Sequence, residues 1–295
     1  MHEQILNRRQ LLGGITAAGA AGLLGGVGTR SATAAEAPDF GPSQPPQITD
    51  VRDKVAYITG ASSGIGLGIA RVFHEAGMKV VIGYRTERNV QEALKYFPPN
   101  DPRIHIVKHD VMDRDGWERT ADEIEKKFGT VHILVNNAGV GVQAPASTGS
   151  LKDWEWGLGV NLWGPIYGIH TFVPRMLASK QGSHIVTTTS TSGILPGSGA
   201  GIYTVAKIAA VGLMEELRHE LRNTNIGTSA FIPGLTTSNI ADSERNRPES
   251  LRNDEQPRAT LPSGPSQSFS RASAPPRPAA SDNADPLFAR PHDPV

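Results

Sequence analysis

The chain has 295 residues, a formal net charge of zero at pH 7 and no cysteine. The length indicates one large domain or two small ones. The balanced charge gives no reason to expect a nucleic-acid partner. The absence of cysteine excludes disulfides, thiolate nucleophiles and cysteine-based metal sites. The nine histidines have no spacing typical of metal ligands, so no metal is predicted.

Residues 1–35 have the pattern of an export signal. Arg8 and Arg9 precede a mildly apolar run rich in glycine and alanine, and small residues up to Ala35 offer a cleavage site. The pattern resembles a bacterial twin-arginine signal peptide. The run is too weakly apolar to predict a stable membrane span. We therefore expect a periplasmic or exported protein, and a cytoplasmic one if the arginine pair arose by chance.

Two further segments have compositions typical of unfolded peptide. Residues 36–52 are a predicted proline-rich linker. Residues 254–295 are dominated by Pro, Ser, Ala and Arg and have no apolar period. Such a segment cannot bury enough surface to offset the entropy of ordering, so we expect a disordered tail. The predicted folded part is a single domain over residues 53–253.

Short apolar runs alternate with helical stretches through this domain. The runs are rich in Val, Ile and Thr, as expected of buried parallel strands. They lie at residues 54–60, 78–84, 104–110, 131–139, 183–190 and 226–234. The helical stretches lie at about residues 64–77, 89–97, 114–129, 150–180 and 202–222. This alternation predicts an α/β fold with a doubly wound, Rossmann-like parallel sheet.

The sequence TGASSGIG follows the first predicted strand. Its glycines Gly60, Gly64 and Gly66 are spaced G-x-x-x-G-x-G rather than G-x-G-x-x-G. Between a strand and a helix start, such glycines let the backbone approach a pyrophosphate, and the helix N-terminus offers free N–H groups. A plain tight turn would have the same residues, so the loop alone does not identify a nucleotide site.

The sequence YTVAK places Tyr203 and Lys207 four residues apart in a predicted helix. Residues at this spacing share one face and can act on the same bound molecule. A phenol is a poor acid near neutrality, and a nearby positive charge lowers its pKa. The pair is therefore a candidate proton donor. Because the same spacing also occurs by chance, other motifs must support this interpretation.

Several such motifs lie at the ends of the predicted strands. NNAG (136–139) ends the fourth strand, Ser190 ends the fifth and PG (233–234) ends the sixth. Asn161 lies in VNLWG, in the helix between the fourth and fifth strands. In this order, the set resembles the short-chain dehydrogenase/reductase family, over about residues 55–250. Folds of this kind bind their ligands at the carboxyl ends of the strands.

The resemblance implies four catalytic residues. Tyr203 would protonate a carbonyl oxygen, or deprotonate an alcohol, as hydride moves between the substrate and a nicotinamide. Lys207 would lower the pKa of the tyrosine and hold the nicotinamide ribose, and Ser190 would orient the substrate oxygen. Asn161 would hold a water that joins Lys207 to solvent. Alternatively, its side chain bonds the backbone of its own helix.

The resemblance also implies a set of cofactor-binding residues. Tyr84 stands where an acidic residue would hold a ribose 2′-hydroxyl, and Arg85 can pair with a 2′-phosphate. NADP is therefore favoured over NAD. The full set is Gly60, Ser62, Ser63, Gly64, Ile65, Gly66, Tyr84, Arg85, Asp110, Val111, Asn137, Ala138, Gly139, Tyr203, Lys207, Pro233, Gly234 and Ser238.

The residues that follow these motifs predict the character of the substrate. The expected walls of the substrate site are Val140, Val142, Ile194, Leu195, Leu235 and Ile240. They are apolar, so we expect a hydrophobic secondary alcohol or ketone, aromatic or cyclic. Residues 171–179 and 238–251 resemble dehydrogenases that oxidise benzylic alcohols in lignin-derived dimers. The long helices at 150–180 and 200–222 are expected to form a homodimer or a larger homo-oligomer.

One departure from the family pattern leaves an alternative open. A lid is expected up to about Asn253, but the residues beyond it contain no predicted seventh strand. The main prediction is an NAD(P)-dependent oxidoreductase. The alternative is a cofactor-binding protein with little or no turnover, because fold elements at the C-terminal end are missing. An isomerase or lyase on the same fold is less favoured, since the hydride-transfer residues are intact.

Overall fold

The computed structural model describes residues 45–196, 200–234, 236 and 238–253. The predicted signal peptide, most of the predicted linker and the predicted tail lie outside the described residues. Within the described residues, no helix combines the length and apolar character that a membrane span requires. The His, Asp and Glu side chains of the same residues form no group suited to a metal ion.

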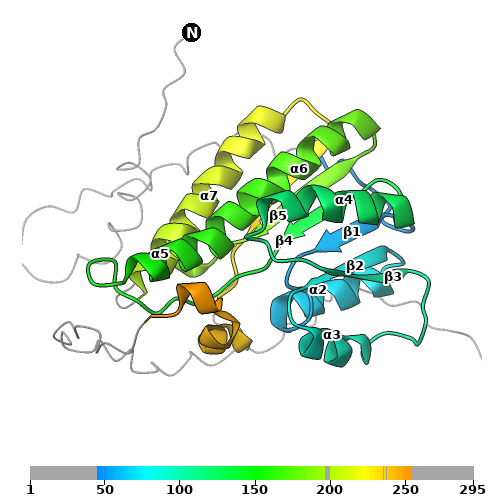
Figure 1. The fold of residues 1–295 in the computed structure, drawn as a ribbon. Coiled ribbons are helices and arrows are strands. Elements are labelled where there is room, and N and C mark those ends of the chain that lie inside the picture. The colour runs from blue at the N-terminus through cyan, green and yellow to red at the C-terminus, as the bar shows by residue number, and fades with distance from the viewer. Residues whose placement is uncertain (1–44, 197–199, 235, 237, 254–295) are drawn as a thin grey trace, which may run out of the picture. The chain divides into compact units, whose positions relative to one another are not determined.

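Six parallel strands of the described residues form one sheet, in the order β3-β2-β1-β4-β5-β6 (Figure 1). They are β1 (Val55–Ile58), β2 (Lys79–Tyr84), β3 (Ile104–Lys108), β4 (Ile133–Asn136), β5 (Ser183–Thr188) and β6 (Ile226–Phe231). Each lies inside its predicted run. The chain order reverses between β1 and β4, which confirms the predicted doubly wound sheet and places a ligand site at this switch point.

Helices cover both faces of the sheet. They are α2 (Gly64–Glu75), α3 (Glu87–Leu94), α4 (Arg114–Phe128), α5 (Leu151–Leu158), α6 (Gly164–Ser179) and α7 (Gly201–Leu221). Helices α2 and α3 pack on one face, whereas α4, α6 and α7 pack on the other. Two short 3-10 helices, η3 (Asn239–Asn246) and η4 (Glu249–Leu251), follow β6.

The strands divide their apolar side chains between two cores. Successive side chains of a strand point to opposite faces of the sheet. In β1, Val55 and Tyr57 therefore join the core under α4, α6 and α7. Ala56 and Ile58 join the core under α2 and α3. All four are almost completely buried, which explains why the run has no polar alternation.

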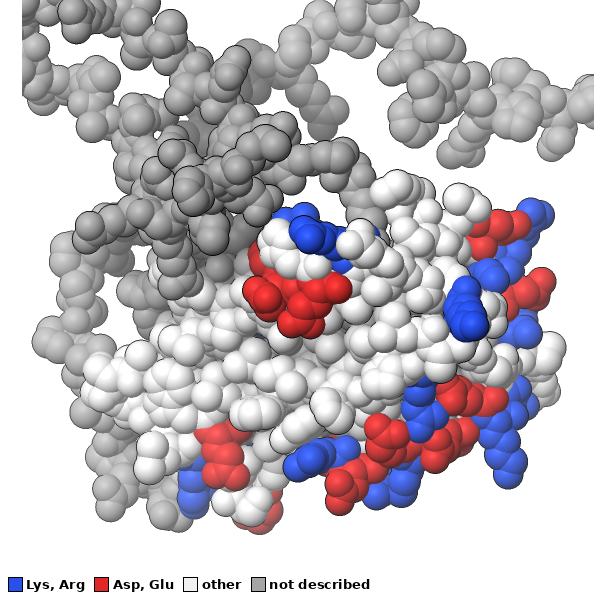
Figure 2. Space-filling view, turned by 90° about the horizontal axis from the view of Figure 1, so that it is seen from above, with Lys and Arg blue, Asp and Glu red and all other residues white. Residues whose placement is uncertain are grey.

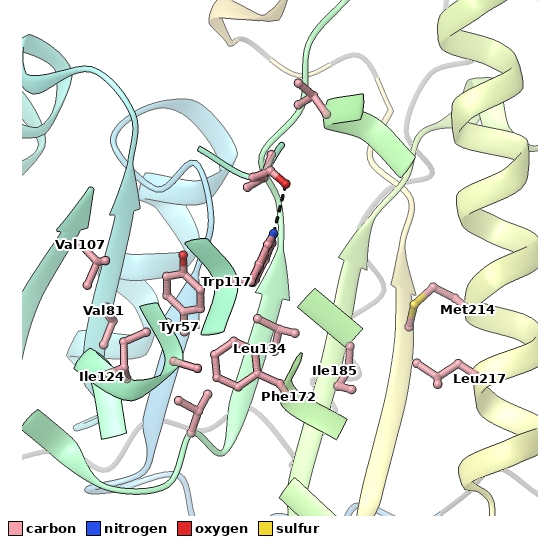
Figure 3. Packing of buried hydrophobic residues seen from close by; sticks show 14 of the residues in the cluster. Tyr57, Val81, Val107, Trp117, Ile124, Leu134, Phe172, Ile185, Met214 and Leu217 are labelled. Atoms are coloured by element: carbon pink, nitrogen blue, oxygen red, sulfur yellow. Dashed lines mark hydrogen bonds between the residues drawn. The ribbon is translucent and has the colours of Figure 1, made fainter. Parts of the chain in front are cut away.

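Aromatic rings fill the centre of the core under α4, α6 and α7 (Figure 3). The ring of Tyr57 meets those of Trp117 and Phe172 with centroids 6.2 and 5.9 Å away. Trp117 Nε1 donates a hydrogen bond to the carbonyl of Val111 at 3.1 Å. The core thereby holds in place the loop after β3, which carries the predicted cofactor-binding residues Asp110 and Val111.

The predicted helix over residues 150–180 is interrupted in the structure. Helix α5 begins with a capping box, in which Ser150 and Asp153 each accept a backbone N–H from the other. A π-helical turn, Gly159–Trp163, separates α5 from α6 and carries Asn161. Such turns occur frequently at functional sites. The apolar pattern of the sequence did not reveal this π-helical turn, because the helices on either side of it keep their ordinary helical spacing.

Ion pairs between a basic side chain of α6 and acidic side chains of α4 join the two helices. Arg175 lies 2.7 Å from carboxylate oxygens of Glu118 and Asp122 and 2.6 Å from Glu125. Figure 2 shows acidic and basic side chains side by side, mainly along the right and lower edges of the face it presents. Exposed pairs contribute only about 0–1 kcal/mol each, so they orient the two helices more than they stabilise the fold.

Candidate active site

A cleft lies at the carboxyl ends of the strands. Its walls come from the loop after β1, the ends of β2, β3 and β4, the start of α7 and the segment after β6. All predicted cofactor-binding residues except Gly66 and Gly234 line it. The predicted catalytic residues Tyr203 and Lys207 line it too. The sheet thus brings together residues as far apart in sequence as Gly60 and Ser238.

The glycine loop shows why glycine is needed at particular positions. Gly60 and Gly64 have φ of +64° and +55°, a backbone conformation that residues with a Cβ rarely adopt. Gly66 has another role. A Cβ at Gly66 would lie 2.6 Å from the carbonyl oxygen of Gly60 and would also meet the side chain of Asn137. Gly66 therefore lets α2 pack closely against the loop, and this is why it does not line the cleft.

Two glycines of α2 provide a matched test of this packing. We expect Gly66→Ala to lower the free energy of unfolding by about 1–3 kcal/mol, because the methyl group must displace backbone. Gly68→Ala should raise it by roughly 0.5–1 kcal/mol, since a Cβ at Gly68 meets no atom within 4 Å. Urea denaturation measures both. Equal effects in the two variants would contradict the close approach at Gly66.

Tyr203 and Lys207 lie one turn apart near the start of α7. Lys207 Nζ is 5.6 Å from the centroid of the Tyr203 ring. Lys207 is 3% exposed, and its Nζ donates to the carbonyl of Thr188 at 2.9 Å. Burial lowers the pKa of Lys207 to about 8, because desolvation penalises the ammonium. The lysine is thus a buried group held by the end of β5.

The pKa of the Tyr203 phenol differs from the sequence prediction. Burial raises its pKa, and a hydrogen bond with the Ser190 hydroxyl acts in the opposite direction with a smaller effect. We predicted a lowered pKa from the neighbouring lysine. The structure corrects this, because desolvation of the phenolate outweighs the effects that stabilise it. Ser190 nonetheless lies beside the phenol, and its Oγ accepts the backbone N–H of Ser192 at 3.2 Å.

Asn161 bonds backbone groups in the structure. Its Nδ2 donates to the carbonyls of Val140 and Gly157, at 2.9 and 3.0 Å, and its Oδ1 accepts the N–H of Val140 at 3.2 Å. The residue is 1% exposed. The bond to Gly157 is of the kind that the alternative describes, and the bonds to Val140 tie the loop after β4 to the π-helical turn. A role for Asn161 in a water relay stays a prediction.

Sequence reasoning missed Thr59, which organises the loop after β4. Its Oγ1 accepts the backbone N–H groups of Asn137 and Ala138 at 2.9 and 3.0 Å. Asn137 Nδ2 in turn donates to the carbonyl of Thr59 at 3.0 Å. A threonine directly before the first glycine of the loop was the available signal. Its partners, almost eighty residues later, could not be deduced from it.

Arg85 joins three parts of the cleft. Its Nε lies 3.1 Å from Asp110 Oδ2, and its Nη1 donates to the carbonyl of Asn246. Tyr84 beside it donates its hydroxyl to Glu87 at 2.9 Å. The predicted contacts for the adenosine end, at the ends of β2 and β3, therefore meet the segment after β6.

Residues 238–253, here called the strap, supply part of the lining of the cleft. Gly141 N donates to Ser243 Oγ at 2.8 Å. Arg247 Nη2 lies 2.8 Å from Asp153 Oδ1, and these two side chains are only 2% and 1% exposed. Their guanidinium and carboxylate connect the strap to α5. The strap corresponds to the predicted lid, which reaches Asn253.

Only some of the residues predicted to form the walls of the substrate site line the cleft. Val140 and Ile240 line the cleft, whereas Val142 is buried in the core. Ile194 and Leu195 are exposed and do not line the described cleft. Leu235 lies outside the described residues. The apolar character of the substrate side therefore depends on fewer residues than the sequence indicated.

The hydrogen-bond donors that line the cleft fit a nicotinamide dinucleotide. The amino end of α2 has no side-chain hydrogen bond from its N-cap Ser63 and no acidic residue in its first turn, which leaves N–H groups for phosphate. Glycines with positive φ leave room for close approach at the same end. Lys207 and Tyr203 line the same cleft and offer an ammonium and a hydroxyl to a nicotinamide and its ribose.

Comparison with known proteins shows to which family this chain belongs. A family model described as short chain dehydrogenase matches residues 54–249. The chain belongs to the short-chain dehydrogenase family. The C alpha-dehydrogenase of Sphingobium sp. (strain NBRC 103272 / SYK-6) is 42% identical over 202 residues, which covers 68% of this chain and 66% of that relative. An uncharacterized oxidoreductase of Staphylococcus saprophyticus is 32% identical over 197 residues, with 66% and 83% covered.

Solved structures of other short-chain dehydrogenases have the same fold. One from Burkholderia phymatum, in complex with NAD, is 38% identical with a TM-score of 0.69, and the match covers 72% of this chain and 76% of that one. LigO from Sphingobium sp. strain SYK-6, in its apo form, is 40% identical with a TM-score of 0.61, over 63% and 70%. This short-chain dehydrogenase therefore has the sequence and fold of a nicotinamide-dependent oxidoreductase.

Proposed function

We propose that this short-chain dehydrogenase transfers hydride between NAD(P)(H) and a hydrophobic secondary alcohol or ketone, aromatic or cyclic. The observation that carries the proposal is that Tyr203 and Lys207 line the same cleft as the glycine loop, with the Ser190 hydroxyl hydrogen-bonded to Tyr203. A bound nicotinamide would supply or accept the hydride at the carbon of the substrate.

The side chains of the chain would handle the proton and the orientation. In reduction, the Tyr203 hydroxyl gives its proton to the carbonyl oxygen as that oxygen gains negative charge. The Ser190 hydroxyl donates a hydrogen bond to the same oxygen and orients it. The Lys207 ammonium stabilises the phenolate that remains and binds the ribose hydroxyls. In oxidation the proton moves the opposite way, from the alcohol to the phenolate.

The substrate class is supported by the cleft and by a relative. Val140 and Ile240 present apolar groups to the cleft, and a relative at 42% identity is named C alpha-dehydrogenase. The test is a panel of aromatic and cyclic secondary alcohols and ketones, with both cofactors, followed by the absorbance of the reduced nicotinamide. Turnover of none of them by a protein that still binds the cofactor would favour the alternative, a binding protein without catalysis.

We propose NADP as the preferred cofactor. Arg85 follows β2 directly, lines the cleft and has a side chain that is 38% exposed, so its guanidinium is within reach of a 2′-phosphate. Its partners Asp110 and Asn246 hold it at that place. A related structure contains NAD, so the choice between the two cofactors needs a direct measurement.

We expect Arg85→Ala to weaken NADPH binding by about 10- to 100-fold, because a charge-assisted hydrogen bond contributes about 1.5–3 kcal/mol. NADH has no 2′-phosphate and should lose much less affinity. Fluorescence titration gives both dissociation constants. Arg119→Ala, which removes an exposed partner of Asp113, is the control. A loss of equal size for the two cofactors would contradict the proposed role of Arg85.

We also propose that the protein is exported through its N-terminal signal and that it forms a homo-oligomer. Exposed apolar side chains on α7 and around the start of α6, among them Trp163 and Val205, support the second point. Native mass spectrometry of the protein from its exporting host measures the length of the mature chain, the number of subunits and any retained cofactor. A full-length monomer would exclude both proposals.

A further inference from the structure

The strap carries an arginine in the lining of the cleft that no sequence motif indicated. Arg245 lies in η3, within the strap, and lines the cleft. Its Nη1 donates to the carbonyls of Asn239, at 2.9 Å, and Asp242. The side chain remains 32% exposed. A guanidinium has five N–H donors, so these contacts leave donors for a ligand in the cleft.

Contacts of the strap place this guanidinium near the glycine loop. A Cβ built on Gly64 would lie 3.3 Å from the Cβ of Ser238, so the start of the strap packs against the start of α2. Asn239 follows Ser238 directly, and its carbonyl holds Arg245 Nη1. The arginine is therefore tied to the part of the strap that packs beside the amino end of α2, where phosphate would bind.

The strap is held on both sides of Arg245. Before it, Ser243 Oγ accepts the N–H of Gly141 at 2.8 Å. After it, the carbonyl of Asn246 accepts from Arg85, and Arg247 makes a buried ion pair with Asp153. Anchors on both sides position the arginine before any ligand binds. A preorganised cation loses little conformational entropy on binding, so its interaction contributes more to affinity.

The ion pair that Arg245 makes within the described residues is weak. Asp242 Oδ2 lies 3.2 Å from its Nη1, and that carboxylate side chain is 77% exposed. Solvent screens such a pair, and its contribution is at most about 1 kcal/mol. A phosphate in the cleft would offer the guanidinium a stronger acceptor at little cost in lost contacts.

We propose that Arg245 binds the pyrophosphate of the dinucleotide, so that the cofactor is held between the amino end of α2 and the strap. The inference rests on the proposed function. The planar guanidinium can pair with two phosphate oxygens at once and adds a full positive charge to the N–H groups of the helix N-terminus. Both NAD and NADP carry a pyrophosphate, so Arg245 would contribute to affinity for either. Arg85 would contribute only to the choice between them.

The experiment measures dissociation constants of NADH and NADPH by fluorescence titration at several salt concentrations. Arg245→Ala should weaken both cofactors by about 10- to 100-fold, and its affinity should depend less on salt than that of the wild type. Arg245→Lys keeps the positive charge but loses the planar pair of donors, so it should lose less affinity than Arg245→Ala. The matched control is Arg252→Ala, which removes an exposed pair with Glu249 in the same strap and should change neither constant.

Several outcomes would overturn the inference. Unchanged binding in Arg245→Ala would do so. A loss confined to NADPH would assign the arginine to the 2′-phosphate instead. Equal losses in Arg245→Ala and Arg245→Lys, with the salt dependence of the wild type, would mean that the residue only shapes the strap. If the wild type itself bound neither cofactor, the proposed function would fail together with the inference, and this result is distinguishable from the other three.

Discussion

Replacing Tyr203 by phenylalanine should lower kcat by about 10²- to 10⁴-fold, the contribution typical of a positioned acid or base. The substitution removes one hydroxyl and leaves the ring, so the cofactor should bind with nearly unchanged affinity. A parallel fall in kcat and kcat/KM, at constant cofactor Kd, is the signature of an interaction made in the transition state. Steady-state kinetics and a cofactor titration measure these quantities.

The pH dependence provides a second measurement of the same role. Burial raises the pKa of Tyr203, so the phenol is protonated near neutral pH and ready to donate in reduction. Oxidation needs the phenolate, so its rate in the wild type should rise as pH increases above neutrality. Tyr203→Phe should abolish this rise. Tyr96→Phe, a change at an exposed tyrosine, is the control, and wild-type turnover in Tyr203→Phe would refute the proposed acid–base role.

Replacing Arg247 by alanine should lower the free energy of unfolding by about 3–5 kcal/mol, because it removes the buried guanidinium that pairs with the buried carboxylate of Asp153. The two side chains are 2% and 1% exposed and lie 2.8 Å apart. The guanidinium also lies over the ring of Trp156, 4.2 Å from its centroid, so packing is lost as well. Urea denaturation measures the change.

The control for this prediction is Arg252→Ala in the same strap. Its pair with Glu249 is exposed, so the free energy of unfolding should change by less than about 0.5 kcal/mol. Proteolysis of the native protein gives a local readout, since a strap released from α5 should be cleaved faster within residues 238–253. If Arg247→Ala were as stable as Arg252→Ala, the buried pair would not be what holds the strap.

Local sequence patterns were sufficient for most of the fold. The six strands lie inside the predicted runs because a strand buried on both faces has few polar residues, and this is visible in a short window. The glycine loop, with its strand before and helix after, is equally local. The spacing of Tyr203 and Lys207 placed both on one helical face, and the structure confirms that they are neighbours.

The order of strands and helices and the residues at the strand ends depend on neighbours along the chain, so a reading of the amino acids alone predicts them. The closing of the cleft depends on contacts between distant segments. Arg247 and Asp153 are 94 residues apart in sequence, and their pairing holds the strap that carries Arg245. The tertiary structure also decided the raised pKa of Tyr203, because burial depends on every element packed around a group and no local pattern records it.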